Sequence, residues 1–290
     1  MLQGRHPRRR DWPAPSTVAD LFSREGLARR PRRRRPRPDH PGAPAIHTEA
    51  SNDLWTADFK GEFRTGDGIY CYPLTIADLH ARYLLDCHGR YSTKTRTEWP
   101  AFEQAFRTYG LPRAIRTDNG PPFATTSIHG LSKLSVWWMR LGIQHQRITP
   151  ATPSENGAHE RMHRTLERRA IRPTRATMAA QQRAFNAFRT EFNEGRPHES
   201  LGMETPASQY TVSTRAYPAR VPGPEYPGYF TVKQITTGGT FRFGTLVLSL
   251  ANALTGERVG LDEVDDGVWW ISFGSTLIAT LDERDYIIRE

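Results

Sequence analysis

The amino-acid sequence predicts an α/β protein, with a mixed five-stranded sheet flanked by helices and a small all-β barrel at its C-terminal end. Three observations lead to this fold class. Three strand-like segments come first, helical periods then alternate with short strands, and the last part of the chain has only strand patterns separated by turns. The 290 residues are enough for about two domains of ordinary size.

Three strands are expected at the start of the sheet, over residues 54–63, 69–79 and 83–88. All three segments are rich in β-branched and aromatic residues, which favour strands. A Gly-Asp-Gly sequence at 66–68 supplies a hairpin turn between the first two. We therefore expect three consecutive antiparallel strands.

Helices and short strands alternate in the next part of the chain, which predicts helices on the faces of a mixed sheet. Residues 97–109 carry apolar side chains at helical spacing, and Gly110 ends that helix. The short strand 113–117 leads into an Asp-Asn-Gly turn. The other expected elements are a helix at 131–141, a strand at 143–148, a long helix from 156 or 157 to 173 and a helix at 178–194.

Changes in composition divide the chain into five parts. Residues 1–28 are expected to be a partial helix-turn-helix remnant with a helix that begins near Ser16, or alternatively a disordered basic tail. Arginines and prolines predict an extended linker at 29–49, before a core at 50–210. A second linker is expected at 211–227, and the barrel at 228–290, with strands at 230–235, 240–250, 258–261, 268–273 and 276–281.

The charge of the chain favours a polyanionic partner, such as a nucleic acid, over a small neutral one. The formal net charge is +9, and twelve arginines against four acids lie in the first 40 residues. Exposed basic residues are often only solvated, but they are also the residues that contact phosphates. The candidate DNA-binding residues are Arg32, Arg33, Arg34, Arg35, Lys94, Arg96, Arg161, Arg164 and Arg168.

Several classes of protein are excluded by composition. No apolar run reaches the length of roughly 18 residues that a membrane span needs, and no apolar segment follows the basic N-terminus as in a secretory signal. We therefore expect a cytoplasmic protein, associated with the nucleoid when bound to DNA. Cys71 and Cys87 are too few for a zinc module and are expected to be buried thiols. Packing is also the expected role of Trp137, Trp138, Trp269 and Trp270.

Three carboxylates stand where strands and a helix could bring them together. Asp58 is at the centre of the first strand, Asp118 follows a short strand, and Glu160 is one turn into the long helix. Each also has an ordinary interpretation: a solvent-facing strand residue, a turn residue, and a helix acid paired with Arg164 four residues on. Converging, they would form the oxygen-rich ligand set of Mg²⁺ ions that act on a phosphate.

The neighbours of these acids carry a family resemblance. The segments are Trp55–Phe59 (WTADF), Arg116–Phe123 (RTDNGPPF) and Pro153–Leu166 (PSENGAHERMHRTL). Together they resemble the DDE integrase core of bacterial insertion-sequence transposases and, more distantly, of retroviral integrases, over residues 50–210. The resemblance implies a ribonuclease H-like fold, a DNA substrate, and metal-dependent strand cleavage and transfer with Asp58, Asp118 and Glu160 as the catalytic triad.

Two alternatives remain open within the motif. Glu155 is a rival third ligand, although the glutamate of the family follows Asn-Gly by three residues, as Glu160 does. His159 and His163 have the helical spacing of a metal-binding pair, but no third ligand is evident in the sequence, so no zinc site is expected. The 41 residues between Asp118 and Glu160 are more than in the better-known relatives.

The expected function is that of a DNA transposase or integrase. Asp58 and Asp118 would bridge two Mg²⁺ ions, with Mn²⁺ as a substitute, and Glu160 would complete the shell of the second ion. A homo-multimer on DNA is expected, because two transposon ends must be brought together. The alternatives are a catalytically silent truncated transposase remnant that only binds DNA, and a nuclease that acts on RNA–DNA hybrids.

Overall fold

The computed structural model describes residues 15–25, 48–125, 130–148 and 157–289. The chain divides into two compact units, residues 1–45 and 46–290. In the first unit, helix α2 (Pro15–Arg24) covers the short helix expected near Ser16, and its Leu21 and Phe22 are exposed. The expected linker at 29–49 lies almost wholly outside the described residues, as do Arg32, Arg33, Arg34 and Arg35, so these remain predictions.

The central sheet has the predicted mixed, ribonuclease H-like arrangement. Its strand order is β4-β3-β1-β5-β6, with the two-residue strand β2 paired to β3. Strands β1, β3 and β4 are antiparallel neighbours in sequence order, as expected, and β5 and β6 continue the sheet parallel to β1. The bounds are Leu54–Phe59 (β1), Phe63–Arg64 (β2), Tyr70–Asp78 (β3), Leu84–Arg90 (β4), Ala114–Thr117 (β5) and Gln144–Arg147 (β6).

The first expected strand, 54–63, is interrupted in the structure. Gly61 has a φ of +94°, a left-handed conformation that an extended strand does not contain and that glycine adopts readily. Strand β1 therefore ends at Phe59, and Phe63 begins the separate strand β2. Asp58 thus stands one residue from the end of β1 rather than at the centre of a longer strand.

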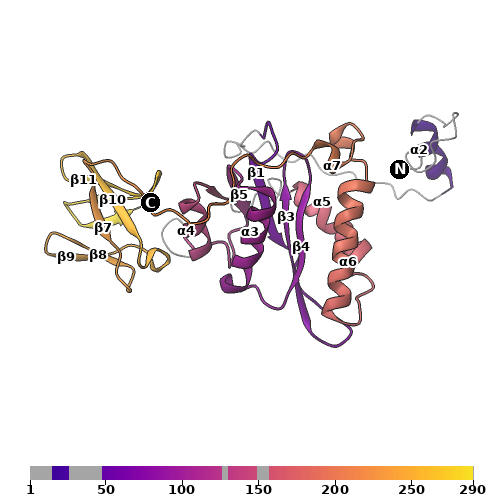
Figure 1. The fold of residues 1–290 in the computed structure, drawn as a ribbon, viewed down its shortest axis with the longest axis horizontal. Coiled ribbons are helices and arrows are strands. Elements are labelled where there is room, and N and C mark those ends of the chain that lie inside the picture. Colours follow the sequence, from indigo (N-terminus) through magenta and orange to yellow (C-terminus); the bar gives the residue numbers. More distant parts are fainter. Residues whose placement is uncertain (1–14, 26–47, 126–129, 149–156, 290) are drawn as a thin grey trace. The chain divides into compact units, whose positions relative to one another are not determined.

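Helices cover both faces of this sheet (Figure 1). Trp55 and Ala57 of β1 pack into a buried cluster with α3 and α4, whereas the alternate residues Thr56 and Asp58 face the side of α5. The helices are α3 (Thr95–Tyr109), α4 (Lys133–Arg140), α5 (Gly157–Leu166) and α6 (Met178–Thr190), with π-helical turns at Glu167–Ile171 and Glu191–Gly195 that continue α5 and α6.

Aromatic side chains form much of the core between the sheet, α3 and α4. Trp55, Phe102, Phe106 and Trp138 are fully buried, and each contributes about 2–3 kcal/mol through burial of apolar surface. Trp137 stacks on Trp99 with ring centroids 4.2 Å apart. Trp137 and Trp138 therefore have the packing role expected of them.

The second face of the sheet contains the two cysteines. Cys71 and Cys87 are buried free thiols in a cluster with α5 and α6, as expected. Burial raises the pKa of Cys71 to about 12, because the thiolate would lose its hydration there. At neutral pH this cysteine is therefore a packing residue and not a nucleophile.

The C-terminal part is all-β, as expected, and its described strands form two antiparallel sheets around one apolar cluster. The expected strand 240–250 is a hairpin, because Gly244 turns the chain with a φ of +57°. Trp270 is 46% exposed, unlike the other three paired tryptophans, so it does not have the packing role expected of it. The strands are Thr231–Gln234 (β7), Thr240–Phe243 (β8), Leu246–Ser249 (β9), Arg258–Asp265 (β10), Val268–Phe273 (β11), Thr276–Asp282 (β12) and Ile287–Arg289 (β13).

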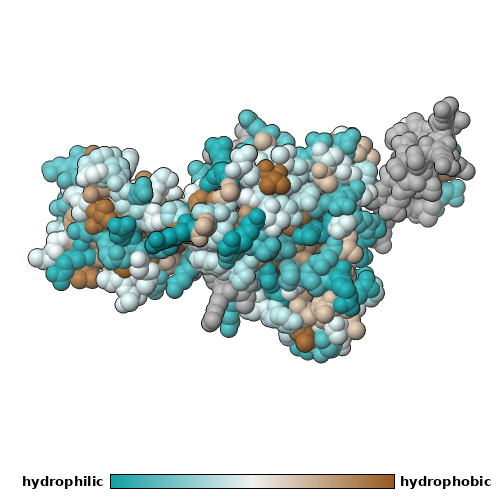
Figure 2. All heavy atoms as spheres, viewed as in Figure 1, coloured by the Kyte–Doolittle hydropathy of each residue, from teal (hydrophilic) through white to brown (hydrophobic). Residues whose placement is uncertain are grey.

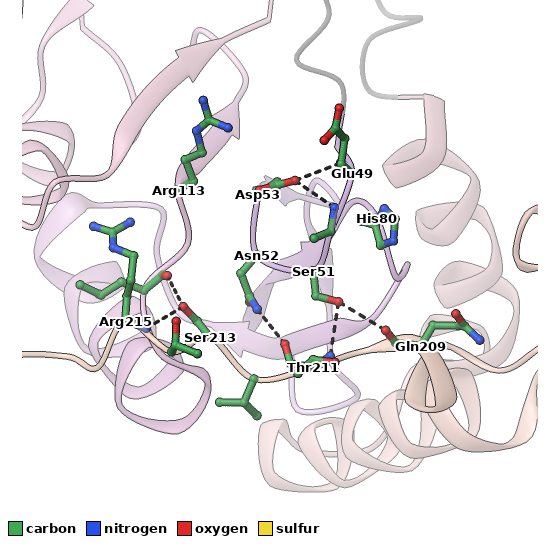
Figure 3. Close-up of a pocket in the computed structure, with 14 residues that line it drawn as sticks. Glu49, Ser51, Asn52, Asp53, His80, Arg113, Gln209, Thr211, Ser213 and Arg215 are labelled. Atoms are coloured by element: carbon green, nitrogen blue, oxygen red, sulfur yellow. Dashed lines mark hydrogen bonds between the residues drawn. The ribbon is translucent and has the colours of Figure 1, made fainter.

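The segment that follows the core is hydrogen-bonded to it rather than free. Asn52 donates from Nδ2 to the carbonyl oxygen of Thr211 (2.7 Å), and Arg215 donates from Nη1 to that of Pro112 (2.7 Å). Figure 3 shows Asn52, Thr211 and Arg215 around a hollow of about 500 Å³ at the N-terminal ends of β1 and β5. The first residues of the expected linker at 211–227 are thus part of the folded core surface, and the domain boundaries remain predictions.

The face drawn in Figure 2 is mainly hydrophilic, with small, separate apolar spots. Within the described parts of the chain, no helix is long and apolar enough to cross a membrane.

Candidate metal centre

Two of the expected acidic residues lie at equivalent ends of neighbouring strands. β1 and β5 run parallel, with Thr56 beside Arg116 and Ala57 beside Thr117. The next residues along the two strands are Asp58 and Asp118. Equivalent residues of adjacent parallel strands are about 4.8 Å apart, so a continuation of this register would set Asp58 beside Asp118 at the carboxyl edge of the sheet, and the convergence of their carboxylates stays a prediction.

Asp58 is partly buried beside α5. Its side chain is 21% exposed, and its Oδ2 atom lies 3.9 Å from Nδ1 of His163. Thr75 is its register partner on β3, and the Thr75 hydroxyl donates to the Asp58 carbonyl oxygen at 3.1 Å. The strand end that carries the carboxylate is therefore hydrogen-bonded to the sheet and lies beside α5.

His159 and His163 attach α5 to this face of the sheet. They are one helical turn apart, and their rings meet edge to face with centroids 4.6 Å apart. Thr75 Oγ1 shares hydrogen bonds with Nε2 of His159 (2.6 Å) and Nε2 of His163 (2.7 Å), and Thr56 Oγ1 shares one with Nδ1 of His159 (2.8 Å). All four side chains are buried, so they fix the first two turns of α5 against β1 and β3.

Burial sets the charge of the groups around the site. Loss of hydration lowers the pKa of His159 to about 3 and that of His163 to about 2, with the neighbouring His159 and Lys60 lowering the latter further. Both imidazoles are therefore uncharged at neutral pH. Partial burial raises the pKa of Asp118, and the backbone N–H of Gly120, which donates to its carboxylate, partly offsets this.

Glu160 lies in the first turn of α5 and is exposed. It is adjacent in sequence to His159 and one turn before His163, the two residues that fix α5 beside Asp58. Its rival, Glu155, falls within residues 149–156, outside the described chain, so the choice between the two glutamates rests on the sequence motif.

One group of three potential metal ligands occurs within the described ranges. The donor atoms of Asp58, His159 and His163 all lie within 4.8 Å of one another, and neither Asp118 nor Glu160 belongs to this group. Sequence reasoning found the histidine pair but no third ligand for it. The third donor, Asp58, comes from β1, about 100 residues earlier in the chain. Thr56 and Asp58 are two residues apart in a strand and therefore face the same side of the sheet, which is the one sequence feature that could have indicated it.

The donor set fits a divalent cation. Carboxylate oxygens from two strand ends are the ligands that Mg²⁺ and Mn²⁺ prefer, and Glu160 can add a third carboxylate from α5. The imidazole of His163 would offer a nitrogen, which suits Mn²⁺ better than Mg²⁺.

The expected DNA-binding residues in the core lie at its surface where they are described. Lys94 precedes α3 and is exposed, and Arg161, Arg164 and Arg168 are exposed on α5 and the π-helical turn that follows it. The side chain of Arg96 is outside the described part of the structure. Their contact with DNA remains a prediction.

Comparison with protein families identifies this part of the chain. The model of the Integrase core domain matches residues 48–153, and a second Integrase core domain model matches residues 141–206. The chain contains an integrase core. The matched region includes all three expected acids, as well as both histidines of the metal group.

Relatives of the integrase core occur in bacterial insertion elements and retroviruses. An uncharacterized protein of insertion element IS476 from Xanthomonas euvesicatoria is 29% identical over 212 residues, which are 72% of this chain and 59% of that protein. An uncharacterized protein of insertion element IS407 from Burkholderia multivorans is 28% identical over 205 residues, 68% of each chain. This chain therefore spans about three fifths of the first relative and two thirds of the second.

Viral integrase structures are among the solved structures that resemble this chain in fold. The catalytic core of HTLV-2 integrase, determined in complex with magnesium, has a TM-score of 0.43 and 16% identity, over 56% of this chain and 99% of that one. A chain of the simian T-cell lymphotropic virus intasome has a TM-score of 0.49 and 15% identity, over 83% of this chain and 84% of that one.

Proposed function

We propose that this protein is a DNA transposase that cleaves and joins DNA strands at a divalent metal centre formed by Asp58, Asp118 and Glu160. The observation that carries the proposal is the parallel register of β1 and β5, which sets Asp58 and Asp118 at equivalent strand ends within the matched integrase core. The relatives from insertion elements support a role in the movement of DNA.

Each residue of the centre would have a distinct task. Asp58 and Asp118 would hold a cation between the two strand ends, and Glu160 would contribute a carboxylate from α5. Divalent ions bound there would activate a water or a 3′-hydroxyl as nucleophile and stabilise the leaving oxygen of the phosphodiester. The buried contacts of His159 and His163 with Thr75 would keep α5 in register with the strands, so that the carboxylates need little rearrangement.

Duplex DNA would approach along the basic side of α5. Arg161 and Arg164 are exposed on the same helix as Glu160, and Arg168 follows in the next turn. These side chains and Lys94 would contact phosphates, which fix the position of DNA without reading its sequence. The twelve arginines of the first 40 residues would add nonspecific affinity. A homo-multimer would be needed to hold two ends at once.

The test is a cleavage and strand-transfer assay on DNA that carries the ends of the element encoding this protein. We expect Asp58→Asn, Asp118→Asn and Glu160→Gln to lower both reactions by about 100-fold or more and to leave duplex binding unchanged. Glu199→Gln is the matched control, because Glu199 is an exposed glutamate outside the centre. Both Mg²⁺ and Mn²⁺ are supplied, in parallel reactions.

Two results would contradict the proposal. One is full activity in the three acid variants, which would place the chemistry elsewhere. The other is a wild-type protein that binds duplex DNA but neither cuts nor joins it with either metal, which would identify a catalytically silent DNA-binding protein.

A further inference from the structure

We propose that Nδ1 of His163 is a ligand of the divalent cation held by Asp58, which gives this centre a nitrogen ligand and a preference for Mn²⁺ over Mg²⁺. The inference rests on the proposed function, because it concerns the same cation. It adds to the carboxylates a residue from the inner face of α5.

The distance between the two donor atoms suits a shared ion. Nδ1 of His163 and Oδ2 of Asp58 are 3.9 Å apart. A charge-assisted hydrogen bond between an N–H and a carboxylate would bring them to about 2.8 Å. Two ligands bound to one octahedral ion at about 2.1 Å are separated by about 3 Å when adjacent and about 4.2 Å when opposite. The observed separation of 3.9 Å lies between these two values, nearer to that of opposite ligands.

The ring of His163 is held with Nδ1 toward Asp58. Its Nε2 atom shares a 2.7 Å hydrogen bond with Thr75 Oγ1, and Thr75 is fully buried. A ring flip would break this bond and leave buried polar atoms without partners. Histidines that bind metals commonly use one nitrogen for the ion and hydrogen-bond the other to the protein, which fixes the tautomer.

The hydrogen bonds beyond Thr75 are consistent with a lone pair on Nδ1 of His163. The Thr75 hydroxyl donates its single hydrogen to the Asp58 carbonyl oxygen at 3.1 Å. Nε2 of His159 and Nε2 of His163 therefore both donate to Thr75 Oγ1, and Nδ1 of His159 accepts from the Thr56 hydroxyl. In the neutral His163 ring, with its hydrogen on Nε2, Nδ1 is left unprotonated.

His159 is not the ligand, although it belongs to the same group of donors. Both of its ring nitrogens are engaged, Nδ1 with Thr56 at 2.8 Å and Nε2 with Thr75 at 2.6 Å. Among the described residues, Nδ1 of His163 has no such hydrogen bond. The two histidines therefore have separate roles: His159 connects the helix to the sheet, and His163 faces the cation.

A nitrogen ligand changes which ion the centre selects. Imidazole binds Mn²⁺ more readily than Mg²⁺, which prefers oxygen ligands and keeps several waters. We expect His163→Gln to weaken Mn²⁺ binding by about tenfold or more and Mg²⁺ binding much less.

The test uses the full chain and Mn²⁺ alone, without DNA. Electron paramagnetic resonance measures the bound Mn²⁺, and electron spin echo modulation detects a nitrogen nucleus bound directly to it. We expect nitrogen modulation in the wild type. Asp58→Asn should lose both the modulation and the tight binding of Mn²⁺. His163→Gln should lose the modulation but still bind Mn²⁺, more weakly. His159→Gln is the matched control and should keep the modulation.

The outcomes separate this inference from the proposed function. Mn²⁺ that needs Asp58 but shows no nitrogen modulation in the wild type would overturn the inference and leave the carboxylate centre intact. Modulation that survives in His163→Gln and disappears in His159→Gln would also overturn it. No Mn²⁺ binding that depends on Asp58 would overturn both. The wild-type spectrum alone decides whether a nitrogen atom binds the Mn²⁺, even where a variant fails to fold.

Discussion

Replacing Thr75 by valine should destabilise the protein far more than its change in shape suggests. Thr75 is fully buried, and its hydroxyl contacts Nε2 of His159, Nε2 of His163 and the carbonyl oxygen of Asp58. Valine has nearly the same volume but no hydroxyl. Each buried polar atom that loses its partner costs about 1–3 kcal/mol, and some of this is recovered by rearrangement, so we expect a loss of about 2–5 kcal/mol for Thr75→Val.

The matched comparison is Thr75→Ser, which keeps the hydroxyl and loses one methyl group, at a cost of about 1 kcal/mol. Equilibrium unfolding in urea, followed by tryptophan fluorescence, gives both free energies of unfolding. The reasoning would be refuted if Thr75→Val were as stable as Thr75→Ser within about 0.5 kcal/mol, because the hydroxyl would then contribute little to the contact between α5 and the sheet.

Three further results are expected. Burial lowers the pKa of His159 to about 3 and that of His163 to about 2, so below about pH 6.5 the unfolded chain binds more protons than the folded one. As the pH falls, the metal-free protein should therefore lose up to about 1.4 kcal/mol of unfolding free energy per pH unit for each histidine. Changing both histidines to glutamine should remove that part of the pH dependence in acid titrations. Asn52→Ala removes the bonds to Trp55 Nε1 and to the Thr211 carbonyl, so it should cost about 2–4 kcal/mol and make residues 209–215 sensitive to limited proteolysis; unchanged cleavage would contradict this. Removal of residues 1–40 should weaken duplex binding and make the plot of log binding constant against log salt concentration less steep, by about 0.9 for each lost phosphate contact. A slope equal to that of the full chain would show that these arginines do not bind DNA.

The sequence predicted the elements that carry the acids, because short-range patterns determine them. The richness of residues 54–63 in β-branched and aromatic residues predicts the strand that carries Asp58, and the Asp-Asn-Gly turn after Ala114–Thr117 places Asp118 at a strand end; that Asp58 also lies near a strand end required the structure. The parallel register that makes the two ends equivalent required the structure.

The polar contacts beneath Asp58 could not be read from the sequence. Thr75 is 84 residues from His159 and 88 from His163, and Thr56 is 103 from His159. Such contacts depend on how strand register and helix rotation combine, and neither leaves a local pattern. The interruption at Gly61 was missed for a related reason, since a glycine in a strand pattern does not reveal the sign of its φ angle.

Crystals of the protein soaked in Mn²⁺ test the central claim most directly, because anomalous scattering locates the ion without reference to activity. The account predicts an anomalous peak bound at about 2.1–2.2 Å by carboxylate oxygens of both Asp58 and Asp118, at the carboxyl ends of β1 and β5. Mn²⁺ peaks that lie only elsewhere, or that touch one of these aspartates and never both, would contradict it.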